Sequence, residues 1–256
     1  MVKTTNCRLQ ILISGGADSK IIVWDTATGE RLHTLRDSQD TMMAVQDLVL
    51  DPQNSTEDEI ILVSASSDPH IRRWRISLSS SSQIVDLALE SQGKLARQTI
   101  LEHQTSVYRV IFWGDDEDTN LWTASADGTA KCLSRAKNWS VEETYEHGDY
   151  VRAIAVTGEW VVTAGRDEDL KVWDQSTGKL RHVYDGHYED VTGIVALPGE
   201  RVVSVSIDGT VRTWEISRSA LEKAIEKKEE RIEVKESVLT AEEEAELAEL
   251  MGSESE

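Results

Sequence analysis

The chain has 256 residues, of which 39% are hydrophobic and 29% charged, and its formal net charge at pH 7 is −20. This length and apolar content suffice for one large or two small packed domains. The negative charge disfavours binding to nucleic acid or to an anionic membrane surface, because both are polyanions. Since the sequence has neither a bilayer-spanning apolar run nor a signal-peptide stretch, we expect a soluble protein of the cytoplasm or nucleus.

A spacing of three side chains recurs five times along the chain. A Ser or Thr is followed four residues later by Asp and, six residues after that, by Trp in four copies and by Leu in one. The sets are Ser14/Asp18/Trp24, Ser64/Asp68/Trp74, Thr123/Asp127/Leu133, Thr163/Asp167/Trp173 and Ser204/Asp208/Trp214. Repetition this strict indicates a structural module rather than a single active site.

Each copy predicts four β-strands. A short apolar run such as 11–13 or 160–162 ends at the Ser or Thr, a turn follows as in 206–210, and a second β-rich run ends at Trp. A third strand follows the next turn, as in 179–184, and a fourth strand follows a His. Four strands in about 40 residues are typical of a β-propeller blade.

In these features the chain resembles the WD-repeat (Trp-Asp repeat) family. The resemblance covers residues 11–217 and rests on IIVWD at 21–25, LKVWD at 170–174, Gly186-His187, and degenerate copies IRRWR at 71–75, VRTWE at 211–215, Glu102-His103 and Glu146-His147. It implies an all-β propeller with about 4.5 to 5 recognisable four-stranded blades. It also implies a non-catalytic protein that needs no cofactor and binds other proteins.

The resemblance further implies a buried hydrogen-bonded tetrad in each regular blade. The complete sets are His147/Thr163/Asp167/Trp173 and His187/Ser204/Asp208/Trp214, whereas His103/Thr123/Asp127 meets Leu133 and should form an incomplete network. A buried polar network of this kind is tolerated when every member has a partner. The same residue types could form a nucleophilic triad, but their recurrence at equivalent positions argues against one catalytic pocket, so we predict no catalytic residue.

The repeats are too few for the roughly seven or eight blades usual in this family. We divide the propeller, residues 1–217, into units near 11–37, 38–103, 104–146, 147–187 and 188–217, and the chain appears to enter at a second strand. Three explanations stay open. Blades preceding the first unit are missing, a partner chain completes an open propeller, or a compact ring has divergent first strands.

Three further segments depart from the repeat. Residues 77–97 form a Ser-rich insertion that predicts a surface loop, with phosphorylation of Ser77 to Ser82 as a weaker alternative. The acidic segments 51–59 and 114–120 predict solvated turns on one rim rather than a metal site, since the calcium-loop spacing is absent. Cys7 and Cys132 are too few for a disulfide framework or a zinc cluster, so we expect reduced packing residues.

The carboxyl-terminal segment, residues 218–256, changes to helical periodicity and carries 13 acidic and 6 basic side chains. The first helix would place Leu221, Ala224, Ile225 and Ile232 near one face. Thr240 and Glu243 form a capping box for a second helix, whose apolar stripe is Leu247, Leu250 and Met251. We expect this acidic tail to pack on the propeller or to fold on a partner.

The partner-binding residues are predicted from the family's narrow face, which exposes the residues three and five after the His and one before the Asp. These positions are Ser106, Tyr108, Ala126, Tyr150, Arg152, Arg166, Asp190, Thr192 and Ile207, with Gln46, Ser67 and Ala17 in the less regular copies. Tyr and Arg carry much of the energy of protein interfaces. Tyr108, Tyr150, Arg152 and Arg166 are therefore the predicted hot spot, with Asp190 beside them.

The leading functional hypothesis is a non-catalytic scaffold for protein–protein interaction within a larger complex. The alternative is a substrate receptor of a cullin-type ubiquitin ligase, many of which carry Trp-Asp-x-Arg at the end of a repeat. The corresponding stretches here, WDTA, WRIS, WDQS and WEIS, lack that Arg.

Overall fold

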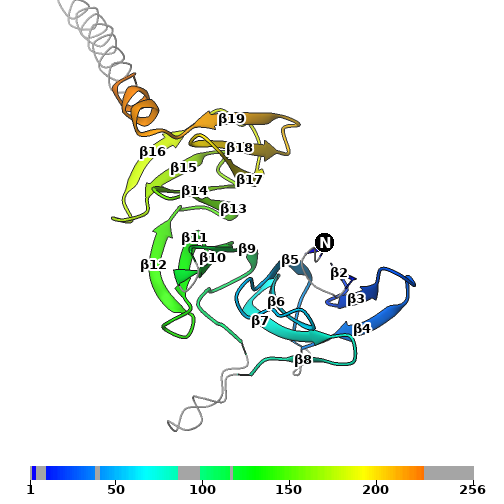
Figure 1. The fold of residues 1–256 in the computed structure, drawn as a ribbon. Helices are drawn as coiled ribbons and strands as arrows, with labels where there is room; N and C mark the ends of the chain where they lie inside the picture. Colours follow the sequence, from blue (N-terminus) through cyan, green and yellow to red (C-terminus); the bar gives the residue numbers. More distant parts are fainter. Residues whose placement is uncertain (1, 4–9, 38–40, 86–98, 116–117, 228–256) are drawn as a thin grey trace, which may run out of the picture.

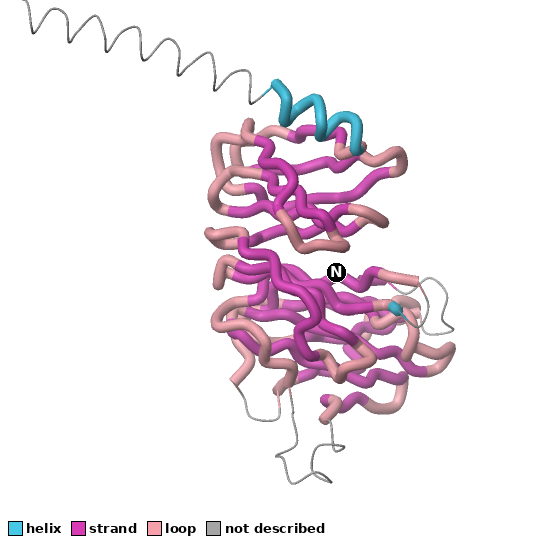
Figure 2. The backbone as a smooth tube through the Cα atoms, turned by 90° about the vertical axis from the view of Figure 1, so that its left-hand side faces the viewer, coloured by secondary structure: helices cyan, strands magenta, loops and turns pink. Residues whose placement is uncertain are grey.

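The computed structural model describes residues 2–3, 10–37, 41–85, 99–115 and 118–227. They form five antiparallel sheets, whose strands follow in chain order, and a helix at residues 218–227 (Figures 1 and 2). The all-β propeller architecture predicted from the repeats is confirmed.

The five sheets are named blades 1 to 5 in chain order. Blade 1 contains β1 (Val2–Lys3), β2 (Ile11–Gly15), β3 (Ile21–Asp25) and β4 (Arg31–Leu35). Blade 2 contains β5 (Val45–Leu50), β6 (Glu59–Ser66), β7 (Asp68–Ser77) and β8 (Ser81–Gln83). Blade 3 contains β9 (Val107–Trp113), β10 (Asn120–Ser125), β11 (Thr129–Ser134) and β12 (Ser140–Glu146). Blade 4 contains β13 (Val151–Val156), β14 (Trp160–Gly165), β15 (Leu170–Asp174) and β16 (Leu180–Tyr184), and blade 5 contains β17 (Val191–Leu197), β18 (Arg201–Ser206) and β19 (Val211–Glu215).

The blades follow one another along an open arc. The first strands contact in sequence, β1 with β5, β5 with β9, β9 with β13 and β13 with β17. Figure 1 shows an opening between blade 1 and blade 5. The described residues therefore form consecutive propeller blades without a closed ring.

Burial along the strands reflects this open arrangement. In blade 4, all six residues of β14 are buried, because a neighbouring blade covers each face of the sheet. In the end blades, burial alternates along β2 and along β18, so only one face is covered.

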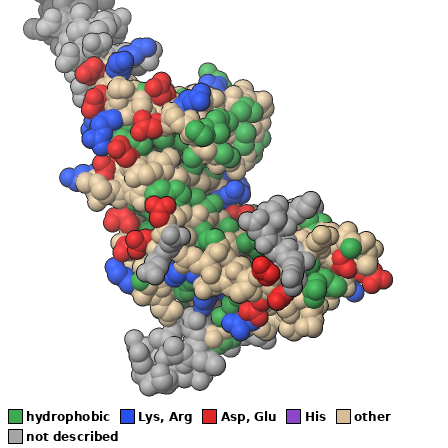
Figure 3. All heavy atoms as spheres, in the orientation of Figure 1, with side chains coloured by type: hydrophobic (Ala, Val, Ile, Leu, Met, Phe, Trp, Pro, Cys, Tyr) green, Lys and Arg blue, Asp and Glu red, His purple; other side chains and the backbone are tan. Residues whose placement is uncertain are grey.

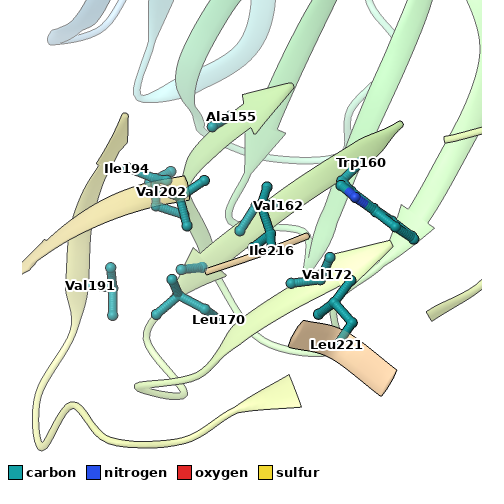
Figure 4. Close-up of a cluster of buried hydrophobic side chains, with 12 residues drawn as sticks. Ala155, Trp160, Val162, Leu170, Val172, Val191, Ile194, Val202, Ile216 and Leu221 are labelled. Carbon is teal, nitrogen blue, oxygen red and sulfur yellow. The ribbon is translucent and has the colours of Figure 1, made fainter. Parts of the chain in front are cut away.

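An apolar core fills each junction between blades. At the junction of blades 4 and 5, Val162, Leu170 and Val172 meet Ile194 and Val202 (Figure 4). The chain then leaves β19 and places Ile216 and Leu221, both 0% exposed, into the same core. Leu221 thus anchors the helix at residues 218–227, while Ile232 and the predicted second helix lie outside the described residues.

The structure differs from the sequence-based expectation at β1. Strand β1 precedes the expected entry point and pairs through Val2 with Ile13 and through Lys3 with Leu12. Two residues are too short to show a β-pattern, which is why sequence analysis missed this strand.

The Ser-rich insertion is also more ordered than expected at its start. Ser77 ends β7, and Ser81 and Ser82 belong to β8, which pairs with β7 as the fourth strand of blade 2. The backbone pairing supplies the strand although the side chains lack an apolar pattern. Residues 86–98 of this insertion lie outside the described part of the chain.

Asp51 is not the solvated turn residue that its acidic segment predicts. It is 1% exposed and pairs with the guanidinium of Arg135, with contacts of 2.9 and 2.8 Å to its two carboxylate oxygens. Arg135 also lies over the rings of Phe112 and Trp139 at 5.3 and 5.0 Å. This ion pair links the loop after β5 in blade 2 to the loop after β11 in blade 3.

Cys132 packs in the core between blades 3 and 4. Burial, with nearby Glu142 and Glu143, raises the pKa of its thiol to about 12. The thiol is therefore protonated and unreactive at neutral pH. Cys7 lies outside the described residues.

Candidate protein-interaction face

Blades 4 and 5 each contain a hydrogen-bonded chain of Trp, Thr or Ser, His and Asp. In blade 4, Trp173 Nε1 donates to Thr163 Oγ1 at 2.8 Å, and Thr163 Oγ1 and His147 Nδ1 are 2.8 Å apart. His147 Nε2 donates to Asp167 Oδ1 at 2.8 Å. Because His147 is 3% and Thr163 0% exposed, these groups satisfy one another away from water.

The equivalent contacts in blade 5 have similar lengths. Trp214 Nε1 donates to Ser204 Oγ at 2.8 Å, His187 Nε2 lies 2.7 Å from the same oxygen, and His187 Nδ1 donates to Asp208 Oδ2 at 2.9 Å. Two blades therefore repeat the same network, as a structural element does.

Blade 3 keeps three members of the network. His103 Nε2 lies 2.7 Å from Thr123 Oγ1, and His103 Nδ1 donates to Asp127 Oδ2 at 2.8 Å. Leu133, which is 0% exposed, occupies the position of the Trp and packs without donating a hydrogen bond.

Blade 2 replaces the His with an ion pair that sequence analysis missed. The Arg72 side chain is 0% exposed and its guanidinium contacts Asp37 at 3.2 Å and Asp68 at 3.0 Å. Thr41 Oγ1 donates to the same Asp37 at 2.5 Å, and Trp74 Nε1 still donates to Ser64 Oγ at 2.9 Å. A sequence signal exists, because a cation stands four residues after the Asp in four repeats, at Arg72, Lys131, Lys171 and Arg212.

The tetrad carboxylates are held ionised. Burial acts to raise the pKa of Asp167, but hydrogen bonds from His147 and Lys171 outweigh it and lower that pKa to about 2. Burial likewise opposes ionisation of Asp127, yet hydrogen bonds from His103 and Thr129 hold its pKa well below the usual range. These carboxylates therefore stabilise the folded state only while they are charged.

This shift predicts a pH-dependent stability. Because the folded pKa of Asp167 is about 2 and its ordinary value is 3.8, the unfolded chain binds the proton more readily. The ionised Asp167 carboxylate stabilises the folded state by about 2 kcal/mol. This stabilisation is complete above about pH 4 and is lost as the pH falls through about 2. We expect the wild-type free energy of unfolding to fall more steeply over this window than that of Asp167→Asn, as measured by urea unfolding. Glu168→Gln, a neighbouring carboxylate outside the tetrad, is the control, and parallel pH profiles for wild type and Asp167→Asn would contradict the assignment.

The tetrads position the residues of the predicted face. In blades 3, 4 and 5, the residue before the tetrad Asp donates its backbone amide to the carbonyl of the residue that lies three after the tetrad His. These bonds run from Ala126 to Ser106 at 2.9 Å, from Arg166 to Tyr150 at 3.0 Å and from Ile207 to Asp190 at 3.0 Å. Blade 2 has the same bond from Ser67 to Ala44 at 2.8 Å. The predicted positions are thus structurally equivalent in these four blades.

The structure gathers the predicted hot-spot residues into two contacting groups. Arg152 lies over the ring of Tyr108 at 4.8 Å and donates from Nε to Asp190 Oδ2 at 3.0 Å. This row crosses blades 3, 4 and 5. In the second group, Arg166 lies over the ring of Tyr150 at 5.0 Å.

These side chains remain accessible. Tyr150 is 39% exposed, the side chains of Arg152 and Asp190 are 34% and 22% exposed, Arg166 is exposed and Tyr108 is partly buried. A stack of Arg on Tyr loses little conformational freedom when a partner binds. We call Tyr108, Tyr150, Arg152, Arg166 and Asp190 the Tyr/Arg face.

A third stack was missed from the sequence. Arg212 lies over the ring of Tyr188 at 5.7 Å, and Tyr188 is 75% exposed. Tyr188 directly follows the tetrad His, a position outside the template used for the face. The cation four residues after Asp208 was the available signal.

A cavity of about 340 Å³ lies beside the base of blade 4, lined by Gly158, Glu159, Trp160, Asp174, Gln175, Ser176 and Arg218. Its charged groups are already engaged, since Arg218 pairs with Glu159 at 3.2 Å and Asp174 accepts from Ser176 at 2.6 Å.

Within the described ranges, no three His, Cys, Asp or Glu side chains are grouped as metal ligands. Asp115 and Asp118 flank residues outside those ranges. No helix in the described part of the chain is both long and apolar enough to cross a membrane.

The family model described as "WD domain, G-beta repeat" matches residues 139–174 and 178–215. A Schizosaccharomyces pombe protein named "Uncharacterized WD repeat-containing protein C126.01c" is 32% identical over 242 residues, covering 94% of this chain and 60% of that protein. The Aspergillus niger nuclear distribution protein nudF is 25% identical over 222 residues, covering 81% of this chain and 47% of its own length. The chain thus spans only part of the length of these relatives.

Among solved structures, the crystal structure of the WD40 β-propeller domain of Doa1 is similar, with a TM-score of 0.59 and 20% sequence identity. The similarity covers 82% of this chain and 62% of that domain, and it bears on the fold alone. The repeats, the matched family model and the structural similarity together show that the chain carries WD repeats, which fold as the blades of a β-propeller.

Proposed function

We propose that the chain is a non-catalytic scaffold that binds a protein partner through the Tyr/Arg face, in the cytoplasm or nucleus. WD40 propeller domains typically serve protein interaction and are generally non-catalytic. The chain's net charge of −20 favours a protein partner over a nucleic acid.

The observation that carries this proposal is the row Tyr108, Arg152 and Asp190, which joins three blades through a stack of 4.8 Å and an ion pair of 3.0 Å. Tyr and Arg combine large contact area with directed hydrogen bonds, and they dominate measured interface hot spots. The contacts between them hold the side chains in place before a partner arrives. Arg166 on Tyr150 supplies a further exposed cation beside the row.

The test replaces Tyr108, Tyr150, Arg152 and Arg166 together by Ala. We expect loss of at least about 10-fold in capture of the principal partner from lysate, since each hot-spot residue is worth about 1–2 kcal/mol or more. The thermal transition should remain, because these side chains are outside the junction cores and a partly exposed ion pair contributes at most about 1 kcal/mol.

The matched control removes three exposed arginines elsewhere, Arg31, Arg75 and Arg181, and should leave capture unchanged. Unchanged capture by the four-residue variant would reject the Tyr/Arg face. Cullin-ligase adaptor subunits among the captured proteins would instead support the ligase-receptor alternative.

A further inference from the structure

Blade 5 presents an apolar sheet face whose equivalent in blade 4 is buried. In blade 4, the face toward blade 5 consists of Ala153, Ala155, Val162, Ala164, Leu170 and Val172, all 5% exposed or less. Counting from the tetrad residues, the equivalent positions in blade 5 are Gly193, Val195, Val203, Val205, Val211 and Thr213. Blade 5 therefore keeps Val at four of the six positions where a following blade would pack.

These residues form one continuous patch. Strand pairing sets Val195 opposite Val203, and sets Val205 opposite Val211. Val195, Val205 and Val211 are 59%, 40% and 69% exposed, and Figure 3 shows hydrophobic side chains gathered on this part of the molecule. A grouped apolar patch marks a binding surface more often than scattered single residues do.

Blade 1 presents the complementary kind of face. At every junction in the arc, the residue at the Trp position of the later blade packs against the earlier blade: Trp74, Leu133, Trp173 and Trp214. In blade 1 the same face holds Leu12, Ile22 and Trp24, all only partly buried, because no blade precedes it within the described residues. Trp24 Nε1 still donates to Ser14 Oγ at 3.0 Å, so the face is formed as in the other blades.

We propose that two copies of the chain associate head to tail, with the patch Val195, Val203, Val205 and Val211 of one copy packing on Leu12, Ile22 and Trp24 of the next. The contact would continue the junction that the arc repeats four times, between surfaces of matching apolar character. It is heterologous, because it joins two different surfaces. This inference does not depend on the Tyr/Arg face, and failure of either leaves the other standing.

The test uses the full chain and two variants, Val211→Asp and Ile22→Asp, each of which spoils one of the two surfaces. By sedimentation or light scattering, wild type should rise from 28.6 kDa to at least twice that mass with concentration. Each variant alone should remain a monomer. An equimolar mixture of the two variants should form a dimer and nothing larger, since one intact surface of each kind remains to pair.

Leu78→Asp is the matched control, because Leu78 is 57% exposed and lies outside both surfaces, and it should associate like wild type. Circular dichroism melting of each variant verifies folding. A wild type that stays monomeric at every concentration would overturn the proposal. That result holds equally if the two surfaces pack against each other within one chain or if a different protein covers them. A mixture of variants that stays monomeric, while wild type associates, would also overturn the head-to-tail geometry.

Discussion

Replacing Arg72 by Met is expected to lower the free energy of unfolding by about 3–5 kcal/mol, because it leaves two buried carboxylates without their cation. Asp37 and Asp68 are 7% and 6% exposed and contact Arg72 at 3.2 and 3.0 Å. Burial acts to raise the pKa of Asp68, but amides of Met43 and His70 together with Arg72 keep that pKa below its ordinary value. Without Arg72, part of the stabilisation that keeps the Asp68 carboxylate ionised in its buried site is lost.

The measurement is urea unfolding at neutral pH, with Arg75→Met as the matched control. Arg75 lies on the same strand, is 57% exposed and pairs with Glu59 at 3.4 Å, so its loss should cost less than about 1 kcal/mol. Adding Asp37→Asn to Arg72→Met should recover part of the loss, because it neutralises one of the two carboxylates that lose their contact with Arg72. Equal costs for Arg72→Met and Arg75→Met would show that the buried ion pair does not stabilise blade 2.

Thr163→Val is expected to cost about 2–4 kcal/mol, because it leaves two buried nitrogens without a partner. The hydroxyl of Thr163 is the shared partner of Trp173 Nε1 and His147 Nδ1, each at 2.8 Å. Valine has nearly the same shape, so the loss reports the hydrogen bonds rather than a cavity.

Blade 3 supplies the comparison within the same protein. Thr123→Val leaves one buried side-chain nitrogen, His103 Nε2, without a partner, since Leu133 stands at the Trp position, and it should cost about 1–2 kcal/mol. Thr34→Val, at an exposed position on β4, should cost almost nothing. The prediction is wrong if urea unfolding gives equal losses for Thr163→Val and Thr123→Val.

The sequence was sufficient for the fold because the repeat encodes local geometry. The same spacing separates the tetrad residues of blade 5, Ser204, Asp208 and Trp214, and those of blade 4, Thr163, Asp167 and Trp173. In both blades, hydrogen bonds of 2.7–2.9 Å join these residues and the tetrad His into one network. One blade could therefore be predicted from another. Leu133 was informative for the same reason, because an apolar residue at a donor position leaves a shorter network.

The contacts that lie outside the repeat could not be predicted in the same way. Arg72 meets Asp37 across 35 residues, and Arg135 meets Asp51 across 84 residues, so neither pair has a fixed spacing. Neither buried Arg was identified from the sequence, because burial of a guanidinium depends on where its partner folds. The face was only partly predictable, since the template located Tyr108, Arg152 and Asp190 but not their mutual contacts, and it passed over Tyr188.

The central claim is that the tetrads hold the blades together while the Tyr/Arg face binds a partner. It is tested most directly by measuring partner capture and unfolding free energy on the same two variants, Thr163→Val and the four-residue Ala variant of the face. Capture is measured at a temperature where both variants are folded. The predicted result is that Thr163→Val loses stability but retains capture, whereas the face variant retains stability but loses capture. Loss of capture by folded Thr163→Val, with capture retained by the face variant, would contradict this division of roles.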